Sequence, residues 1–208
     1  MAVIRDAVIQ SRDLTVFQKA YAEAPTVPTD ANIVTATAAP SGSLSGYTKK
    51  QASDGGVGFS TQQERTPVYI DQKADRLYSI EGARTVQITA QLAEITPENM
   101  QLATGMGEVG TLAASASAYG HEELVVGPPT DPEYNTYLVT APQPFSRLPF
   151  GVFVSCAQSE GTLNFNISPT QKAIAALVTT ALLDESYDPE DYDGGLLFIA
   201  RRITPMTA

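Results

Sequence analysis

The stretch Thr85–Leu92, "TVQITAQL", alternates between polar and apolar residues at every position. The polar residues are Thr85, Gln87, Thr89 and Gln91, and the apolar residues are Val86, Ile88, Ala90 and Leu92. Successive side chains of a β-strand point to opposite faces, so a period of two predicts a strand with one apolar face and one polar face. A strand of this kind packs one face on a core and turns the other toward water.

Looser versions of the same pattern occur along the rest of the chain and predict further strands. They cover Gly56–Ile70, Tyr137–Thr140, Val152–Cys156, Leu163–Ile167, Ile174–Leu183 and Leu196–Ile203. The residues "SEG" at Ser159–Gly161 suit a hairpin turn between two of these strands. The sequence therefore predicts a mainly β domain.

One short helix is expected after the alternating stretch. Thr96 is a good N-cap, Pro97 suits the first helical position, and Glu98 places a negative charge in the first turn. Gly105 stands where a left-handed glycine commonly ends a helix. The sequence therefore predicts a mainly β domain that carries a single short helix.

Residues 1–55 differ in composition from residues 56–208. They are rich in Ala, Thr, Ser, Pro and Gly, and "SGSLSG" at Ser41–Gly46 reads as a flexible linker. We expect an extended N-terminal arm over 1–55, with at most a short strand near Ala2–Ile9, and a folded domain over 56–208.

Composition excludes several classes of protein. The 208 residues carry a net charge of −10, and no basic run is longer than two residues, which argues against tight binding of DNA or RNA. The single cysteine excludes an internal disulfide framework and a Cys-x-x-Cys zinc site. The first residues are too polar for a signal peptide, and no apolar run approaches the ~18 residues of a membrane span. We expect a soluble protein of intracellular origin.

The motif "GMGEVG" at Gly105–Gly110 matches the spacing of a dinucleotide-binding loop. Such a loop must follow a strand and open a helix, so that the helix N-terminus meets the pyrophosphate. Here the glycines follow the expected helix. We interpret them as a helix end and a loop, and we expect no nucleotide cofactor.

Other candidate sites are equally weak. The acidic stretch Asp184–Gly195 fails the calcium-loop pattern, because aligning Gly194 at position 6 places Pro189 at position 1. His121 has no neighbours that would build a zinc site, and a surface turn is the simpler interpretation. Cys156 lies in an apolar run typical of a buried thiol. We therefore expect no catalytic, metal-binding or cofactor-binding residues, and no enzyme activity.

The stretch Ser45–Gly105 resembles the major tail tube proteins of long-tailed, siphovirus-like bacteriophages. Its pieces match in order: "GYT", "GGVGFS", "ERTPVYIDQKAD", "ARTVQITAQLAEIT" and "PENMQLATG". The likeness continues more weakly through "LVTTALLDES" and "GGLLFIARRI", and the N-terminal "MAVIRDAVIQ" also looks like the leader of these proteins.

This resemblance implies a tail-tube-type β-sandwich or barrel flanked by the short helix. Its copies form hexameric rings, with one sheet of each copy joining its neighbours. The rings stack into a hollow tube in the virion tail, assembled in the cytoplasm of the bacterial host. Expected partners are further copies of the chain, a tape measure protein, a tail terminator and distal tail or baseplate proteins. Double-stranded DNA would pass transiently and without sequence specificity, and no membrane is involved.

Two surfaces would carry this role. We expect Thr85, Gln87, Thr89 and Gln91 to face the channel, where uncharged side chains offer DNA phosphates no anchor. A ring of six copies would carry about −60, and an anionic lining would repel DNA.

The polar segment Asp71–Arg84 is expected to be a loop that reaches the next ring. Its charged residues are Asp71, Lys73, Asp75, Arg76, Glu81 and Arg84. The alternative for this segment is a disordered hairpin tip.

Two other roles would fit the acidic, β-rich, cysteine-poor composition. One is another virion structural protein, such as a capsid decoration or head–tail joining protein. The other is an immunoglobulin-like binding module of an adhesin or tail spike, which should be monomeric.

Overall fold

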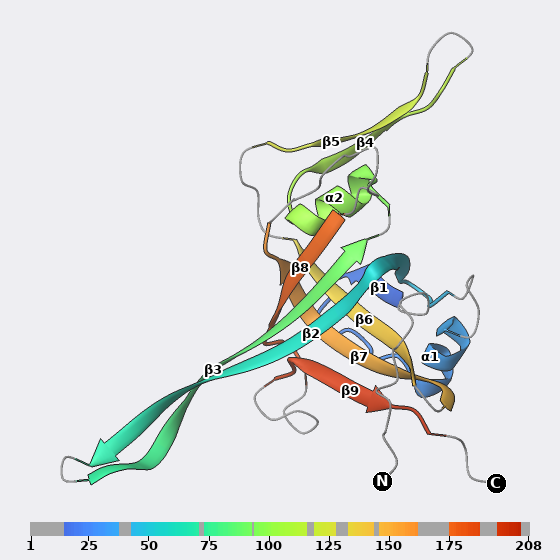
Figure 1. Cartoon of the computed structure of the whole chain (residues 1–208). Coiled ribbons are helices and arrows are strands. Elements are labelled where there is room, and N and C mark those ends of the chain that lie inside the picture. The colour runs from blue at the N-terminus through green and yellow to red at the C-terminus, as the bar shows by residue number, and fades with distance from the viewer. Residues whose placement is uncertain are drawn as a thin grey trace.

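The computed structural model describes residues 15–37, 43–70, 73–92, 94–115, 119–127, 133–143, 146–161, 175–187 and 195–204 (Figure 1). The strands are β1 (Thr15–Ala20), β2 (Thr48–Ile70), β3 (Lys73–Leu92), β4 (Glu108–Leu112), β5 (His121–Val125), β6 (Tyr134–Gln143), β7 (Ser146–Ser159), β8 (Ala175–Leu182) and β9 (Phe198–Arg202). The helices are α1 (Asp30–Thr37) and α2 (Pro97–Thr104). The described chain is mainly β, as the alternating patterns predict.

The main sheet closes on itself. Its strands follow the order β6-β1-β2-β3-β8-β7, and β6 also pairs with β7, so these six antiparallel strands form a barrel. The last strand, β9, pairs with β7 beside β8 and lies outside the closed ring. Of the sandwich and the barrel that the sequence left open, the pairings show the barrel.

The barrel interior is the main hydrophobic core. Val86, Ile88, Ala90 and Leu92 all point into it, as the alternation in Thr85–Leu92 predicts. Ile88 and Leu92 are fully buried, and each such side chain contributes about 1.5–3 kcal/mol through its removal from water. Leu102 of α2 joins the same core, so the helix covers one end of the barrel.

A second core lies on the outside of β1, β6 and β7. Phe17, Leu138 and Phe153 point away from the barrel interior and pack against Ile33 and Ala36 of α1. Strands β1, β6 and β7 are therefore buried on both faces, which explains why residues of both parities are apolar along them.

The expected N-terminal arm is wrong over much of its length. β1 pairs with β2 on one side and with β6 on the other, and Val16 and Phe17 have no exposed surface. Helix α1 was not expected, and β2 begins at Thr48 rather than at Gly56. A six-residue strand buried on both faces shows too little alternation to stand out in an Ala- and Thr-rich segment. Residues 1–14, with the short strand expected near Ala2–Ile9, lie outside the described residues.

Two ribbons project from the body of the molecule (Figure 1). β2 and β3 pair along almost their whole length, but β8 joins β3 only from Val86 to Leu92, so the rest of the pair extends as a two-stranded ribbon. The second ribbon is the separate two-stranded sheet of β4 and β5 beside α2.

The strands expected over residues 56–70, 137–140, 152–156, 174–183 and 196–203 correspond to β2, β6, β7, β8 and β9. Several of them are longer in the structure than their patterns suggested, because pairing extends beyond the alternating core-facing residues. The strand expected over Leu163–Ile167 lies outside the described residues.

Candidate assembly surfaces

The outer face of β3 is polar and uncharged. Thr85, Thr89 and Gln91 are exposed and Gln87 is half-buried, all on the face opposite the core residues. The pairing registers place Ser60 and Gln62 of β2, Ala176, Val178 and Thr180 of β8, and Gln158 of β7 on the same face. We call these ten residues the polar face.

One carboxylate adjoins the polar face. Glu160 Oε1 accepts hydrogen bonds from Gln87 Nε2, at 2.8 Å, and from the Thr180 hydroxyl group. The hydrogen bond from Thr180 has the larger effect and that from Gln87 the smaller, and together they lower the pKa of Glu160 below its usual range. Glu160 therefore stays ionised at neutral pH and holds Gln87 across β3 and β8.

The prediction that the ring-stacking segment Asp71–Arg84 forms a loop is wrong, because residues 73–84 belong to a strand. Lys73, Asp75 and Arg76 belong to β3, and β2 and β3 pair up to Ile70 and Lys73. The alternation in this segment is obscured by register shifts near Gln63 and Val68, which interrupt the period of two. Asp71 lies outside the described residues.

Charged side chains on the near part of this ribbon form a small exposed cluster. The carboxylate of Glu81 lies 3.8 Å from Nη2 of Arg65 and 3.8 Å from Nη2 of Arg84. All three side chains are more than half exposed, so these pairs contribute little to stability. They remain available to a partner.

Helix α2 has the ends that its sequence indicates. The Thr96 hydroxyl accepts from the Asn99 backbone N–H, at 3.2 Å, and Pro97 is the first helical residue. Gly105 ends the helix in the left-handed conformation, with φ 63°, and its N–H donates to Gln101 O at 2.7 Å. The glycines of "GMGEVG" thus follow a helix and lead into β4, which is the reverse of a dinucleotide loop.

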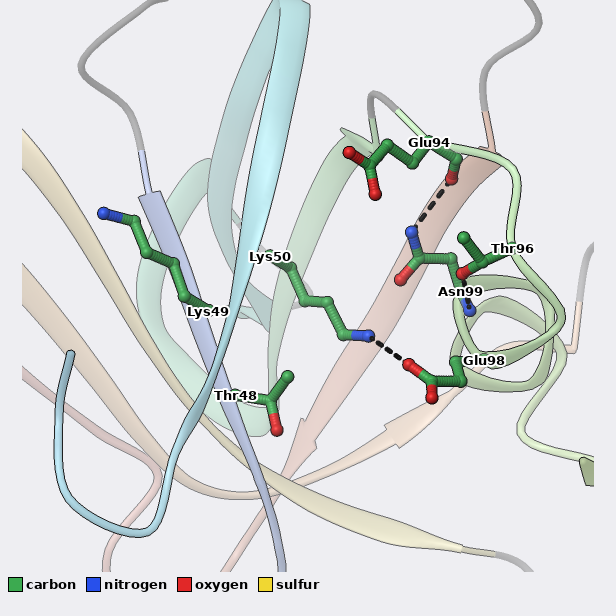
Figure 2. Close-up of a pocket in the computed structure, with 7 residues that line it drawn as sticks. All are labelled: Thr48, Lys49, Lys50, Glu94, Thr96, Glu98 and Asn99. Carbon is green, nitrogen blue, oxygen red and sulfur yellow. Dashed lines mark hydrogen bonds and ion pairs between the residues drawn. The ribbon is translucent and has the colours of Figure 1, made fainter. Parts of the chain in front are cut away.

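A polar pocket of about 330 Å³ lies between the start of β2 and the start of α2 (Figure 2). Lys50 points into it and pairs with Glu98 at 3.7 Å, whereas the neighbouring Lys49 points away. Asn99 donates from Nδ2 to Glu94 O at 2.9 Å, and its buried Oδ1 atom has no hydrogen-bond partner among the described residues. The Lys50–Glu98 ion pair therefore links α2 to β2 across this pocket.

A larger cleft of about 810 Å³ lies where the β2–β3 ribbon leaves the barrel. Its walls are Thr61–Gln63 of β2, the Glu81–Val86 part of β3 and the segment from Gly195 to Phe198 that enters β9. Leu183 is 49% exposed at this cleft, and the Phe198 ring stacks edge-on against Phe59 at 5.1 Å between centroids. No sequence pattern indicated this cleft, because it arises from strands far apart in the chain.

The structure also places the two isolated candidates, His121 and Cys156. His121 lies on β5 rather than in a turn, with Nε2 3.9 Å from Glu123 Oε2. Cys156 is a buried free thiol, and burial, with a smaller effect of Asp184, raises its pKa to about 11.

Within the described ranges, no three His, Cys, Asp or Glu side chains are grouped to hold a metal ion. No helix of the described chain is both long and apolar enough to cross a membrane.

Comparison with known proteins identifies no family for the chain. No protein-family model matches the chain, and no curated protein matches it.

Proposed function

We propose that the chain is a structural subunit that assembles with copies of itself into rings, and that the rings stack into the hollow tail tube of a bacteriophage. Double-stranded DNA passes through the tube without being held. The observation that carries the proposal is the polar face, which presents Gln, Thr and Ser side chains where a DNA-binding surface would present Lys and Arg. The proposal that the copies form stacked rings comes from the likeness of Ser45–Gly105 to tail tube proteins.

The charge of the chain supports passage rather than binding. With a net charge of −10 in each copy, an assembled tube repels DNA at long range. The polar face then offers hydrogen bonds to water but no cation that would release counterions from phosphates. In this proposal the face lines the channel.

The long β2–β3 ribbon supports stacking. It extends well beyond the barrel, and Arg65, Glu81 and Arg84 give it exposed charges of both signs. Mixed charges favour correct register over raw affinity, which suits a contact that must repeat identically at each ring. The tape measure, terminator and distal tail proteins would meet the two ends of the tube.

Because the barrel closes within one chain, the sheets of neighbouring copies can join only at strand edges that closure leaves open. In the described part these edges include those of the two ribbons.

Electron microscopy of the purified protein tests the proposal. We expect stacked rings with a central hole. Removal of Lys73–Tyr78, which shortens the ribbon, should leave rings that no longer stack, whereas Thr26→Ala, on an exposed loop, should stack normally. A protein that stays monomeric at all concentrations, or that forms only solid knobs or trimers, would overturn the proposal and favour a binding module or a capsid decoration protein.

A further inference from the structure

The polar pocket between β2 and α2 contains a hydrogen-bond acceptor that no described residue satisfies. Asn99 is 6% exposed, its Nδ2 atom donates to Glu94 O, and its Oδ1 atom has no partner among the described residues. Asn99 lines the pocket and directs Oδ1 toward its interior (Figure 2). Leaving a buried acceptor unpaired is costly, so such groups are normally satisfied by water, by an ion or by a ligand.

Two carboxylates border the same pocket. Glu94 and Glu98 both line it, and both residues are exposed. Glu98 is paired with Lys50 at 3.7 Å, whereas no ion pair of the Glu94 carboxylate occurs among the described residues. Because Lys49 points away, the charges at the pocket are one positive and two negative. The pocket therefore combines a net negative charge with an open carbonyl oxygen.

This combination fits a hard cation better than an anion. Carboxylate and amide carbonyl oxygens are typical ligands of Ca²⁺, which tolerates irregular geometry and lets water complete its coordination. Mg²⁺ demands a near-ideal octahedron, which side chains as exposed as those of Glu94 and Glu98 are poorly suited to hold. An anion would have to separate Lys50 from Glu98 and then lie beside two carboxylates and a carbonyl oxygen.

We propose that the pocket binds one Ca²⁺ ion through the carboxylates of Glu94 and Glu98 and through Asn99 Oδ1, with water as the remaining ligands. All three side chains come from residues 94–99, the segment that leads from the end of β3 into α2. The ion therefore clamps this connection at the end of the barrel. The site lies within one chain, so the inference does not depend on the proposed function.

Lys50 competes with the ion for the same carboxylate. Its side chain is only 11% exposed, and its ammonium group already pairs with Glu98. The positive end of the α2 dipole lies on this side of the pocket as well. Both effects oppose a second cation, so we expect weak binding, with a dissociation constant on the order of 0.1–1 mM.

No sequence motif indicated this site. Glu94, Glu98 and Asn99 lack the spacing of a calcium loop, and the third ligand is an amide rather than a carboxylate. Only the fold shows that Asn99 is buried with one oxygen unpaired.

Equilibrium dialysis with radioactive calcium tests the proposal. Ionic strength of about 0.15 M should be used, because it screens diffuse binding to the acidic chain. Wild-type protein should bind one saturable Ca²⁺ ion per chain. Glu94→Gln, which keeps the Lys50–Glu98 pair, should weaken binding by about tenfold or more, and Glu94→Gln combined with Glu98→Gln should abolish it.

Glu108→Gln combined with Glu122→Gln is the matched control. It also removes two negative charges, from exposed residues on opposite faces of the β4–β5 sheet, and it should bind Ca²⁺ as the wild type does. Equal binding by the pocket variant and by this control would mean that Ca²⁺ binds only diffusely, and the proposal would be wrong.

Lys50→Met distinguishes a cation site from a pocket that merely holds a lysine. Removal of the competing ammonium group should tighten Ca²⁺ binding by about tenfold or more. Calcium at ten times the dissociation constant should then raise the thermal midpoint by about 3–6 °C. A pocket that only holds Lys50 would lose stability in this variant and gain no affinity for Ca²⁺.

Two further results would overturn the proposal. One is the absence of saturable Ca²⁺ binding in both the wild type and Lys50→Met. The other is a thermal midpoint that inorganic phosphate raises and calcium does not, with the effect lost in Lys50→Met, because that result would identify an anion site.

Discussion

Gly58 lies directly opposite Thr89 on the outer surface of β2 and β3, and a Cβ atom at Gly58 would overlap the Thr89 hydroxyl oxygen. The glycine thus allows the threonine side chain to lie across the neighbouring strand. The polar face is shaped by this close approach as well as by its alternating pattern.

The relationship between Gly58 and Thr89 predicts a change of sign in a double-mutant cycle. In the wild-type background, Gly58→Ala should lower the free energy of unfolding by about 0.5–1.5 kcal/mol, because Thr89 must leave its preferred rotamer. In a Thr89→Ala background the nearest atom is gone, and the same substitution should stabilise by about 0.4–1 kcal/mol through the unfolded state. Urea unfolding of the four proteins measures both steps, and equal effects in the two backgrounds would contradict the packing.

Gly105 should be the glycine most sensitive to substitution at the end of α2. Its φ of 63° is costly for other residues, and a Cβ atom there would lie 3.1 Å from Ser159 Cβ. Gly105→Val should lower the free energy of unfolding by about 1–2 kcal/mol or more, and Gly105→Asn should cost less because Asn tolerates the left-handed region.

Gly127 provides the control for this prediction. Among the described residues, no atom beyond the chain neighbours of Gly127 lies within 4 Å of a Cβ atom there, so Gly127→Ala should leave the thermal midpoint nearly unchanged. Similar losses at Gly105 and Gly127 would indicate that the helix end is not the cause.

Cys156 should be slow to react in the folded protein. Burial raises its pKa from 9.0 to about 11, so at pH 8 the thiolate fraction falls roughly 100-fold. The fold favours the neutral thiol over the thiolate. The stabilisation of the folded state by the neutral thiol is therefore fully present below pH 9 and is lost as the pH rises through about 11. Mass spectrometry after iodoacetamide treatment at pH 8 should show alkylation at least about 100-fold slower than in urea. Comparable rates would mean that the thiol is accessible.

The proposed role of the polar face predicts a gain of DNA binding. The substitutions Thr85→Lys and Thr89→Lys would place cations on the channel wall. Assembled tubes of this variant should therefore retain double-stranded DNA and protect it from nuclease at low salt. Retention should weaken steeply as salt is raised. Lysines at Thr26 and Ser43, on exposed loops, should produce no protected DNA; protection by these control tubes, or its absence in the Thr85 and Thr89 variant, would place the polar face outside the channel.

Local signals in the sequence predicted local features well. The strict alternation of Thr85–Leu92 placed Ile88 in the core and Thr89 outside, and the capping residues Thr96 and Gly105 located the helix within one residue. These features depend on neighbours in the chain, so the sequence carries them directly.

Features that depend on distant pairing were missed or misplaced. β1 lies in a segment that looked like an arm, because it is held by pairing with Tyr137 and Leu138 of β6 along one edge and with Lys49 and Lys50 of β2 along the other. The ribbon at Lys73–Arg84 looked like a loop because register shifts broke its period. The β3–β9 cleft has no signal in the sequence at all, since its two walls are more than a hundred residues apart.

The pairing of β1 with β6 also governs the order in which the chain can fold. Thr15 lies opposite Thr140, and the barrel cannot close until the residues between them have been made. At roughly 5–20 residues per second, a ribosome takes several seconds or more to deliver the second strand after the first. During that interval the apolar face of β1 lacks its partner, and the high contact order makes closure itself slow. A nascent chain therefore passes through an open stage in which the apolar residues of β1 can aggregate.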